Sequence, residues 1–398
     1  SISRWLSAMR TAVSTDDPGS PINEETEVSV NAVAALTGEH IAQFCMSASS
    51  LVGQLRALIS EQWLHCPSES IKLIFNSGPL DDAVTLAKSE IRNGGVVQVL
   101  HYEPLKVLSG GADARALLWN VIDGSCLCEF DGHSSWIRSA HLSADGSMVV
   151  TAAADATVRI WKAKGGHCVH VLQGHEGRVN SAVFSPDGKH VLSASEDGTG
   201  RLWLVSDGSC ITTIDNGSVP IRSVAISGDG CLAVFACTDG VGKLYCLEQS
   251  TWLRALQGHR RDVALNSAAF SPKGKLVITA SDDESARIWR VSDGMCLHTL
   301  TGHCRQVCSA SFSSDGLLAL TASKDGQLRL WHVAGGLCAS VFEDARSYIY
   351  SAALAPDGTS VIVGGFDGRA ELLRVTDGEK LMSLEGHRGA VNSVVFAL

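Results

Sequence analysis

One stretch of the chain decides the fold: Gly174–Ile214, with the sequence GHEGRVNSAVFSPDGKHVLSASEDGTGRLWLVSDGSCITTI. Four short segments in it are apolar or alternate between apolar and polar residues, which is the pattern of β-strands. Turn formers such as Pro186-Asp187-Gly188 separate these segments at intervals of about ten residues. Tight turns of this kind join antiparallel neighbours. We therefore expect a four-stranded antiparallel sheet built from Val179–Phe184, Val191–Ser195, Arg201–Val205 and Cys210–Ile214.

The same pattern recurs throughout residues 103–398. A tryptophan, or an apolar residue in its place, returns at spacings of 42, 42, 42, 44, 42 and 42 residues: Trp119, Trp161, Trp203, Tyr245, Trp289, Trp331 and Leu373. A single four-stranded sheet cannot bury both of its faces, whereas copies stacked around an axis bury them and leave only short edges. The spacing therefore predicts seven such sheets arranged around one axis.

The two ends of this region favour a closed ring. The region begins at a second strand, Leu105–Ser109, and the chain finishes on a first strand, Ala390–Phe396. We expect residues 105–131 and 389–398 to share one sheet and so to close the ring. The region resembles the WD-repeat β-propellers, and the resemblance implies a mainly β fold with seven blades over residues 103–398.

The resemblance also implies a buried hydrogen-bond network of His, Ser or Thr, Asp and Trp in each blade. Five sets match, and two blades lose the His, the hydroxyl and the Trp together, carrying Gly217, Phe235 and Tyr245 or Ala345, Val363 and Leu373. The matching sets are His133/Thr151/Asp155/Trp161, His175/Ser193/Asp197/Trp203, His259/Thr279/Asp283/Trp289, His303/Thr321/Asp325/Trp331 and His387/Ser109/Asp113/Trp119. A hydrolase has one catalytic triad, whereas here the His, hydroxyl and Asp recur in five blades, each time with a Trp beside them. We therefore interpret these histidines as structural.

Residues 27–102 have a different pattern. Two alternating segments flank Thr37-Gly38, a helical spacing follows over Ser50–Trp63, and short strands are expected at Ile71–Phe75 and Val96–Leu100. This order resembles ubiquitin and its relatives, a small α+β (β-grasp) fold. The resemblance implies a partner-binding sheet surface with Ile74, Gln98 and Leu100. The alternative is a small mixed domain that only packs against its neighbour. Residues 1–26 are expected to be a flexible N-terminal segment.

Composition narrows the function classes. The chain has 42 acidic and 32 basic residues, a net charge of −10, which disfavours non-specific nucleic-acid binding. No apolar run approaches the roughly 18 residues of a membrane span. The 13 cysteines lack paired metal-like spacing, Cys304 and Cys308 being an isolated pair. No phosphate-cradling or dinucleotide-binding motif is visible. We expect no enzyme activity, metal or cofactor, and a cytoplasmic location, with the nucleus as the alternative.

Arginine is frequent in the segments that enter each first strand, and the resemblance places these segments on the narrow face of a propeller. Convergent guanidinium groups attract carboxylate or phosphate. Aromatic residues stand in the same segments, and the loop Arg260–Leu265 is two residues longer than its counterparts. The predicted partner-binding residues are Trp136, Arg138, Arg178, Arg222, Arg260, Arg261, Arg305, Arg346, Tyr348, Tyr350, Phe366 and Arg388. The alternative is that these arginines are ordinary solvated loop residues.

These observations predict a non-enzymatic scaffold. Its propeller would bind an acidic or phosphorylated protein segment, and its ubiquitin-like module would engage a second protein partner. The alternative is a substrate receptor or adaptor in the ubiquitin-proteasome pathway, with ubiquitin-pathway components as partners. Receptors of that kind often show Trp-Asp-x-Arg at the end of the third strand. Here no Arg stands three residues after any of these tryptophans, which disfavours the alternative.

Overall fold

A computed structural model of the chain describes residues 27–34, 40–47, 49–61, 71–75, 78–86, 88–89, 91, 95–101, 105–343 and 348–397. The chain divides into two compact units, Ser1–Pro104 and Leu105–Leu398. No helix in the described residues is long and apolar enough to cross a membrane.

The first unit contains one five-stranded sheet and one helix. The sheet order is β2-β1-β5-β3-β4, with β1 and β5 parallel and the other pairs antiparallel. The helix covers the sheet with Val52, Leu55 and Ile59, which are buried in the same cluster as Val30 and Val97 of the sheet. The elements are β1 Glu27–Ala34, β2 His40–Ser47, α2 Val52–Ile59, β3 Ile71–Phe75, β4 Gly78–Pro79 and β5 Gly95–His101.

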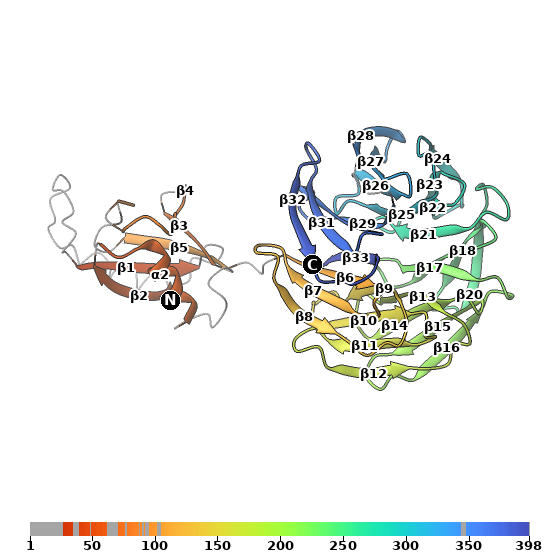
Figure 1. The fold of residues 1–398 in the computed structure, drawn as a ribbon, viewed down its shortest axis with the longest axis horizontal. Helices are drawn as coiled ribbons and strands as arrows, with labels where there is room; N and C mark the ends of the chain where they lie inside the picture. The colour runs from red at the N-terminus through yellow and green to blue at the C-terminus, as the bar shows by residue number, and fades with distance from the viewer. Residues whose placement is uncertain are drawn as a thin grey trace. The chain divides into compact units, whose positions relative to one another are not determined.

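The second unit consists of four-stranded antiparallel sheets, seven in the described residues, which we number one to seven (Figure 1). Sheet one contains β33 Val391–Ala397, β6 Lys106–Gly111, β7 Ala116–Asn120 and β8 Cys126–Phe130; sheet two contains β9 Ile137–Leu142, β10 Met148–Ala153, β11 Val158–Lys162 and β12 Cys168–Leu172. Sheet three contains β13 Val179–Phe184, β14 His190–Ser195, β15 Thr199–Leu204 and β16 Cys210–Asp215; sheet four contains β17 Ile221–Ile226, β18 Leu232–Cys237, β19 Gly242–Cys246 and β20 Thr251–Leu256.

The remaining three sheets have the same order. Sheet five contains β21 Leu265–Phe270, β22 Leu276–Ser281, β23 Ala286–Arg290 and β24 Cys296–Leu300; sheet six contains β25 Val307–Phe312, β26 Leu318–Ser323, β27 Gln327–His332 and β28 Leu337–Glu343. Sheet seven contains β29 Ile349–Leu354, β30 Ser360–Gly365, β31 Arg369–Arg374 and β32 Lys380–Glu385. The strands expected in Gly174–Ile214 are confirmed, with bounds that differ by a residue or two.

The first strands of successive sheets contact one another in a closed cycle, from β9 through β13, β17, β21, β25 and β29 to β33 and back to β9. The last strand of the chain, β33, pairs antiparallel with β6, so that Val394 faces Ser109 and Phe396 faces Val107. Figure 1 shows these strands around a common centre, with the C-terminus beside β6. Sheet one is therefore assembled from both ends of the second unit.

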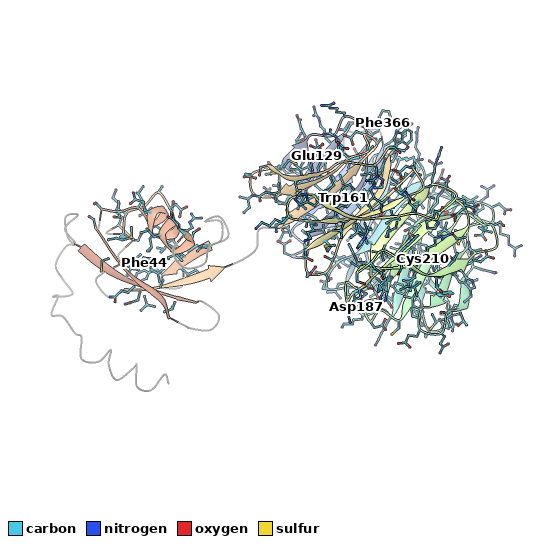
Figure 2. The ribbon with its side chains drawn as sticks, turned by 90° about the horizontal axis from the view of Figure 1, so that it is seen from below. Phe44, Glu129, Trp161, Asp187, Cys210 and Phe366 are labelled. Atoms are coloured by element: carbon cyan, nitrogen blue, oxygen red, sulfur yellow. The ribbon has the colours of Figure 1, made fainter. Side chains whose placement is uncertain are left out.

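The core of this unit lies between neighbouring sheets. Trp161 of sheet two, labelled in Figure 2, packs in one buried cluster with Leu108 and Leu118 of sheet one, and the other junctions repeat this arrangement. The second strands are almost wholly buried, whereas the fourth strands are mostly exposed. Burial is therefore greatest at the second strands, because the first strands are partly exposed to the central cavity and the fourth strands are exposed on the outside.

Candidate interaction surface at the central cavity

The recurring histidines are engaged in a structural network. In sheet two, His133 Nδ1 lies 2.8 Å from Asp155, its Nε2 lies 2.7 Å from Thr151 Oγ1, and the Trp161 indole donates to the same hydroxyl over 2.8 Å. The sets of sheets three, five and six repeat these contacts. In sheet one, His387 reaches Ser109 across the two ends of the chain, at 2.8 Å. The predicted network is confirmed, and none of these hydroxyls is a free nucleophile.

The network fixes the ionisation of its members. Burial lowers the pKa of His175 although Asp197 opposes the shift, so the ring is neutral at pH 7. Burial disfavours the Asp197 carboxylate, but hydrogen bonds from Thr199 and His175 outweigh it and lower the pKa of Asp197 to about 2. The Asp is therefore ionised beside a neutral imidazole, as a stable hydrogen-bonded pair.

Sheet four replaces the network with aromatic rings. Phe235 stands at the hydroxyl position and contacts Tyr245 and Trp252 edge to face, with centroids 6.4 and 5.3 Å away. Sheet seven places Val363 and Leu373 at the corresponding buried positions, while Ala345 lies outside the described residues. Removing the His, the hydroxyl and the Trp together, with only Asp239 and Asp367 kept in the turns, avoids a half-satisfied buried network, which would cost more than an apolar one.

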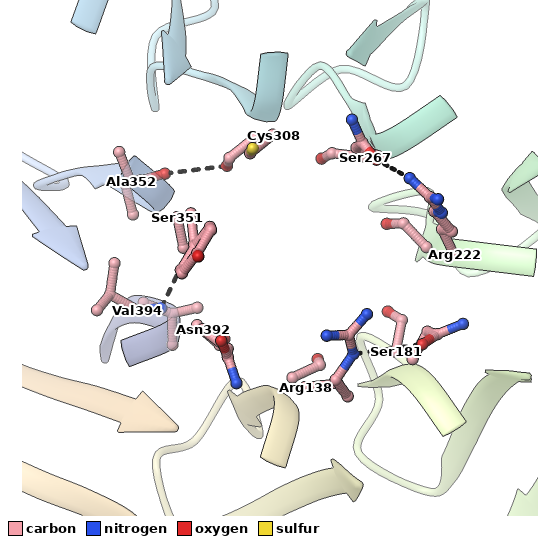
Figure 3. A pocket seen from close by; sticks show the side chains of 18 of the residues that line it. Arg138, Ser181, Arg222, Ser267, Cys308, Ser351, Ala352, Asn392 and Val394 are labelled. Carbon is pink, nitrogen blue, oxygen red and sulfur yellow. Dashed lines mark hydrogen bonds between the residues drawn. The ribbon is translucent and has the colours of Figure 1, made fainter. Parts of the chain in front are cut away.

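A cavity of about 880 Å³ opens at the centre of the ring, lined mainly by the first strands (Figure 3). The second residue of every first strand has no partner in the strand ladder, because the register shifts there. A bulge of this kind re-aims a side chain out of the plane of its sheet. Seven bulge residues thus line the cavity: Arg138, Asn180, Arg222, Asn266, Cys308, Tyr350 and Asn392.

Asparagines hold the two bulge arginines in place. Asn180 donates through Nδ2 to the Ile221 carbonyl over 2.9 Å and accepts from Arg138 Nε at 3.4 Å. Asn266 likewise donates to the Val307 carbonyl over 2.9 Å and accepts from Arg222 Nη1. Because each amide group is anchored on the next sheet, its oxygen points at the guanidinium. The arginines are therefore oriented before any ligand arrives.

The cavity is electropositive. Burial lowers the pKa of Arg138, and the neighbouring cations Arg222 and Arg178 lower it further, while Glu196 and Tyr350 oppose the shift. Lys324 also lines the cavity, and none of the described lining residues is Asp or Glu, although Asp282 behind the lining pairs with Arg222 at 3.2 Å. Within the described residues, the terminal nitrogens of Arg138 make no hydrogen bond. An anion would relieve the repulsion and accept those hydrogen bonds.

Three of the aromatic residues predicted to bind a partner also line the cavity. Trp136, Tyr350 and Phe366 all line it. Tyr348 contacts Phe366 edge to face at 6.3 Å and accepts a hydrogen bond from Arg305 Nη1 at 3.1 Å. The structure thus brings together Trp136, Arg138, Arg222, Tyr350 and Phe366, with Arg305 and Tyr348 beside them.

The other predicted residues do not line the cavity. Arg178, Arg260, Arg261 and Arg388 are exposed on the loops around it. The backbone amides of Arg260 and Arg388 donate to the network residues Asp283 and Asp113, which explains the position of these residues without a ligand. Arg346 lies outside the described residues. In the first unit Ile74 is half-buried, whereas the side chains of Gln98 and Leu100 lie outside the described residues.

Sequence reasoning missed the asparagines and Lys324. Aligning the repeats on the serine that follows each bulge would have revealed the bulge position, because Ser139, Ser181, Ser223, Ser267, Ser309, Ser351 and Ser393 occupy equivalent sites. The described residues contain no cluster of three metal-ligating side chains, and their cysteines are free thiols. Cys308 lines the cavity, and burial raises the pKa of its thiol to about 11, so the thiol is protonated at pH 7.

Comparison with known proteins agrees with this architecture. Residues 124–162, 166–203, 250–290 and 294–332 match the family described as WD domain, G-beta repeat. Each match starts at or just before the fourth strand of one sheet and ends at or near the Trp of the next, so the sequence repeat joins neighbouring sheets. Denticleless protein homolog A of Xenopus laevis is 43% identical over 54 residues, 13% of this chain. The matched stretch spans only 8% of that relative's length. Four stretches of the chain, together less than half of it, are therefore similar to WD repeats, and they lie in four-stranded sheets of the β-propeller kind.

Proposed function

We propose that this protein is a non-enzymatic WD-repeat scaffold in which a seven-bladed propeller binds an anionic protein segment at its central cavity. The observation that carries the proposal is the pair Arg138 and Arg222, oriented by asparagines in a cavity whose described lining lacks carboxylates. Arg222 also pairs with Asp282 at 3.2 Å, whereas Arg138 has no such ion pair among the described residues. Two or three convergent cations match a phosphorylated or acidic side chain, since an Arg fork binds both oxygens of such a group. The protein would act in the cytoplasm.

The first unit would supply a second docking site as a ubiquitin-like module. The parallel pairing of β1 and β5 at the centre of its sheet, with α2 packed on one face, supports this assignment. Its open sheet face, including Ile74, would contact the second partner. A scaffold of this kind brings two proteins together without chemistry of its own.

Affinity capture from native lysate tests the cavity. The double variant Arg138→Ala/Arg222→Ala should lose the partners that the intact chain captures at low salt, because it removes both oriented cations. The double variant Arg290→Ala/Arg374→Ala is the matched control: it removes two half-exposed arginines paired with Asp293 and Asp377, outside the cavity. Equal capture by both variants, at equal thermal stability, would refute the cavity as the binding site.

A chain lacking residues 1–102 separates the two modules in the same assay. Salt-sensitive partners that survive the deletion belong to the propeller. Ubiquitin-proteasome components that vanish with the deletion would favour the alternative function, a substrate adaptor of that pathway.

A further inference from the structure

Two large aromatic side chains at the mouth of the cavity are left exposed. Trp136 of sheet two has 56% of its surface exposed and Phe366 of sheet seven has 62%. Both line the cavity together with the oriented Arg138. Rings of this size are normally buried, and exposed ones beside a polar site are typical anchors of binding surfaces.

Phe366 is held in place although it is exposed. Its ring rests on Tyr348 at 88°, and its backbone amide donates to the Tyr348 carbonyl over 3.2 Å. Tyr348 is fixed in turn by Arg305, whose guanidinium lies 5.6 Å from the Tyr348 ring centroid and donates to its hydroxyl. A ring already fixed in this way loses little conformational freedom on binding a ligand.

Sheet one lies between these two aromatics and contributes three small residues to the cavity lining, besides residues of β33 that include the bulge residue Asn392. Ala112, Gly389 and Ala390 line the cavity there. A Cβ added at Gly389 would lie only 3.4 Å from the Ala112 Cβ, so these two residues form a close-packed, low floor. We call the recess formed by Trp136, Phe366, Ala112, Gly389 and Ala390 the aromatic notch.

The aromatic notch adjoins the cationic part of the cavity. Tyr350 also lines the cavity; burial raises the pKa of its phenol, and the nearby Arg138 guanidinium opposes the shift. The cavity therefore has a cationic sector in sheets two and four and an aromatic sector across sheets seven, one and two. A cationic side chain would be repelled from this mouth, whereas an apolar one loses water contact there at no electrostatic cost.

We propose that the aromatic notch binds an apolar side chain of the same anionic protein segment, a few residues away from its acidic or phosphorylated group. The proposal rests on the proposed function for the charge of the segment and adds a second determinant of specificity. The anionic group is attracted by the cations of the cavity, and the apolar side chain determines which anionic segments stay bound.

The test is a synthetic peptide library applied to the full chain. The central position is phosphoserine, Glu, Ser or Lys, and the flanking positions are randomised. We expect retention of phosphoserine or Glu peptides over Ser and Lys peptides, with Leu, Ile, Met, Phe or Trp enriched at one flanking position. Affinity for an enriched peptide should exceed that of its Ala version by about tenfold, as for an interface anchor.

Two notch variants and one control decide the proposal. Phe366→Ala removes one wall and Ala112→Leu fills the floor, so both should abolish the apolar enrichment while the preference for anions stays. Leu337→Ala is the matched control, because Leu337 is 69% exposed but begins the outer strand β28. Apolar enrichment that is absent, or that persists in both notch variants, overturns the notch and leaves the anion site standing.

The residue preference at the central position of the peptides tests the proposed function separately. Equal retention of phosphoserine, Glu, Ser and Lys peptides overturns the anion site, and with it the notch as a site for anionic segments. Loss of the anion preference in Arg138→Ala, with the apolar enrichment kept, supports both sites. Failure to retain any peptide overturns both.

Discussion

A single hydroxyl joins two aromatic side chains in each complete network: it accepts from the Trp indole and donates to Nε2 of the neutral His. Thr151 accepts from the Trp161 indole and contacts His133, so three buried polar groups are paired in one place. The glycine before each such histidine has a steric cause. A Cβ at Gly132 would lie 2.8 Å from Arg159 Nη1 and 3.2 Å from the Trp161 ring. The Gly-His pair is thus required by the packing of the strand beside it.

At the residue scale we predict the effect of His175→Ala. The change leaves Ser193 and Asp197 without their histidine partner in a buried site, so the free energy of unfolding should fall by about 1–3 kcal/mol. Denaturant unfolding measures the loss. His167→Ala, in an exposed turn, is the control and should unfold like the wild type. Partner capture should be the same for both variants.

The outcome that would contradict this assignment is unchanged stability of His175→Ala. The network would then not be the polar support of sheet three, and the packing of Trp203 alone would have to explain its position.

Sheets differ in how they respond to acid. Burial lowers the pKa of His133, His175 and His303, in sheets two, three and six, below the ordinary value of 6.5. Burial also lowers the pKa of His141, at the cavity, to about 4. Phe235 in sheet four and Val363 in sheet seven stand where other sheets carry the network hydroxyl. Proton uptake on unfolding therefore comes from particular sheets.

At the element scale we predict a loss of stability below about pH 6.5. A histidine whose folded pKa is lowered binds protons more readily when unfolded, so its contribution is complete above the unfolded pKa and declines as pH falls. The carboxylates act in the same direction at lower pH, since the pKa of Asp197 is about 2. Chemical denaturation at pH 7.5, 6, 5 and 4 measures the slope.

His175→Ala is the matched comparison for the titration, because it removes one of the shifted histidines. Its stability should fall less steeply with acid than that of the wild type. Stability that stays constant from pH 7.5 to 5 would show that these histidines do not titrate as neutral buried groups.

The whole second unit depends on a strand from the end of the chain. β33 pairs with β6 and also contacts β9 and β29, the first strands on either side. Val391 and Val394 of β33 are buried. Without β33, the edge of β6 would be exposed and the cycle of first strands would be interrupted.

At the scale of the molecule we predict the effect of ending the chain at residue 390. Deleting β33 should lower the free energy of unfolding by at least about 3 kcal/mol, since two fully buried valines alone contribute about that much. Thermal unfolding and intrinsic Trp fluorescence measure the change. Deletion of residues 1–8, an equal number outside the second unit, is the control. A truncated chain with the wild-type transition would refute closure through β33.

Much of this architecture was predictable because its causes are local and repeated. The alternation in Val179–Phe184 and the turn at Asp187-Gly188 define strands wherever they recur, and the spacing of the network residues follows from one sheet. The absence of the polar network from sheet four was also predictable, because Phe235 and Tyr245 together replace the hydroxyl and the Trp of the other sheets. Which of the loop residues line the cavity was less predictable. Arg260 and Arg388 stand in the same kind of loop as Trp136, yet only Trp136 lines the cavity.

The sequence by itself determined the strands, the repeat and the polar network. Tertiary structure alone decided which side chains meet at the centre. Arg138 and Asn180 are 42 residues apart, and their contact exists only because adjacent sheets bring two bulges together. The aromatic notch likewise needs three neighbouring sheets. Contacts of this kind depend on ring closure and on bulge geometry, neither of which leaves a periodic signal within one strand.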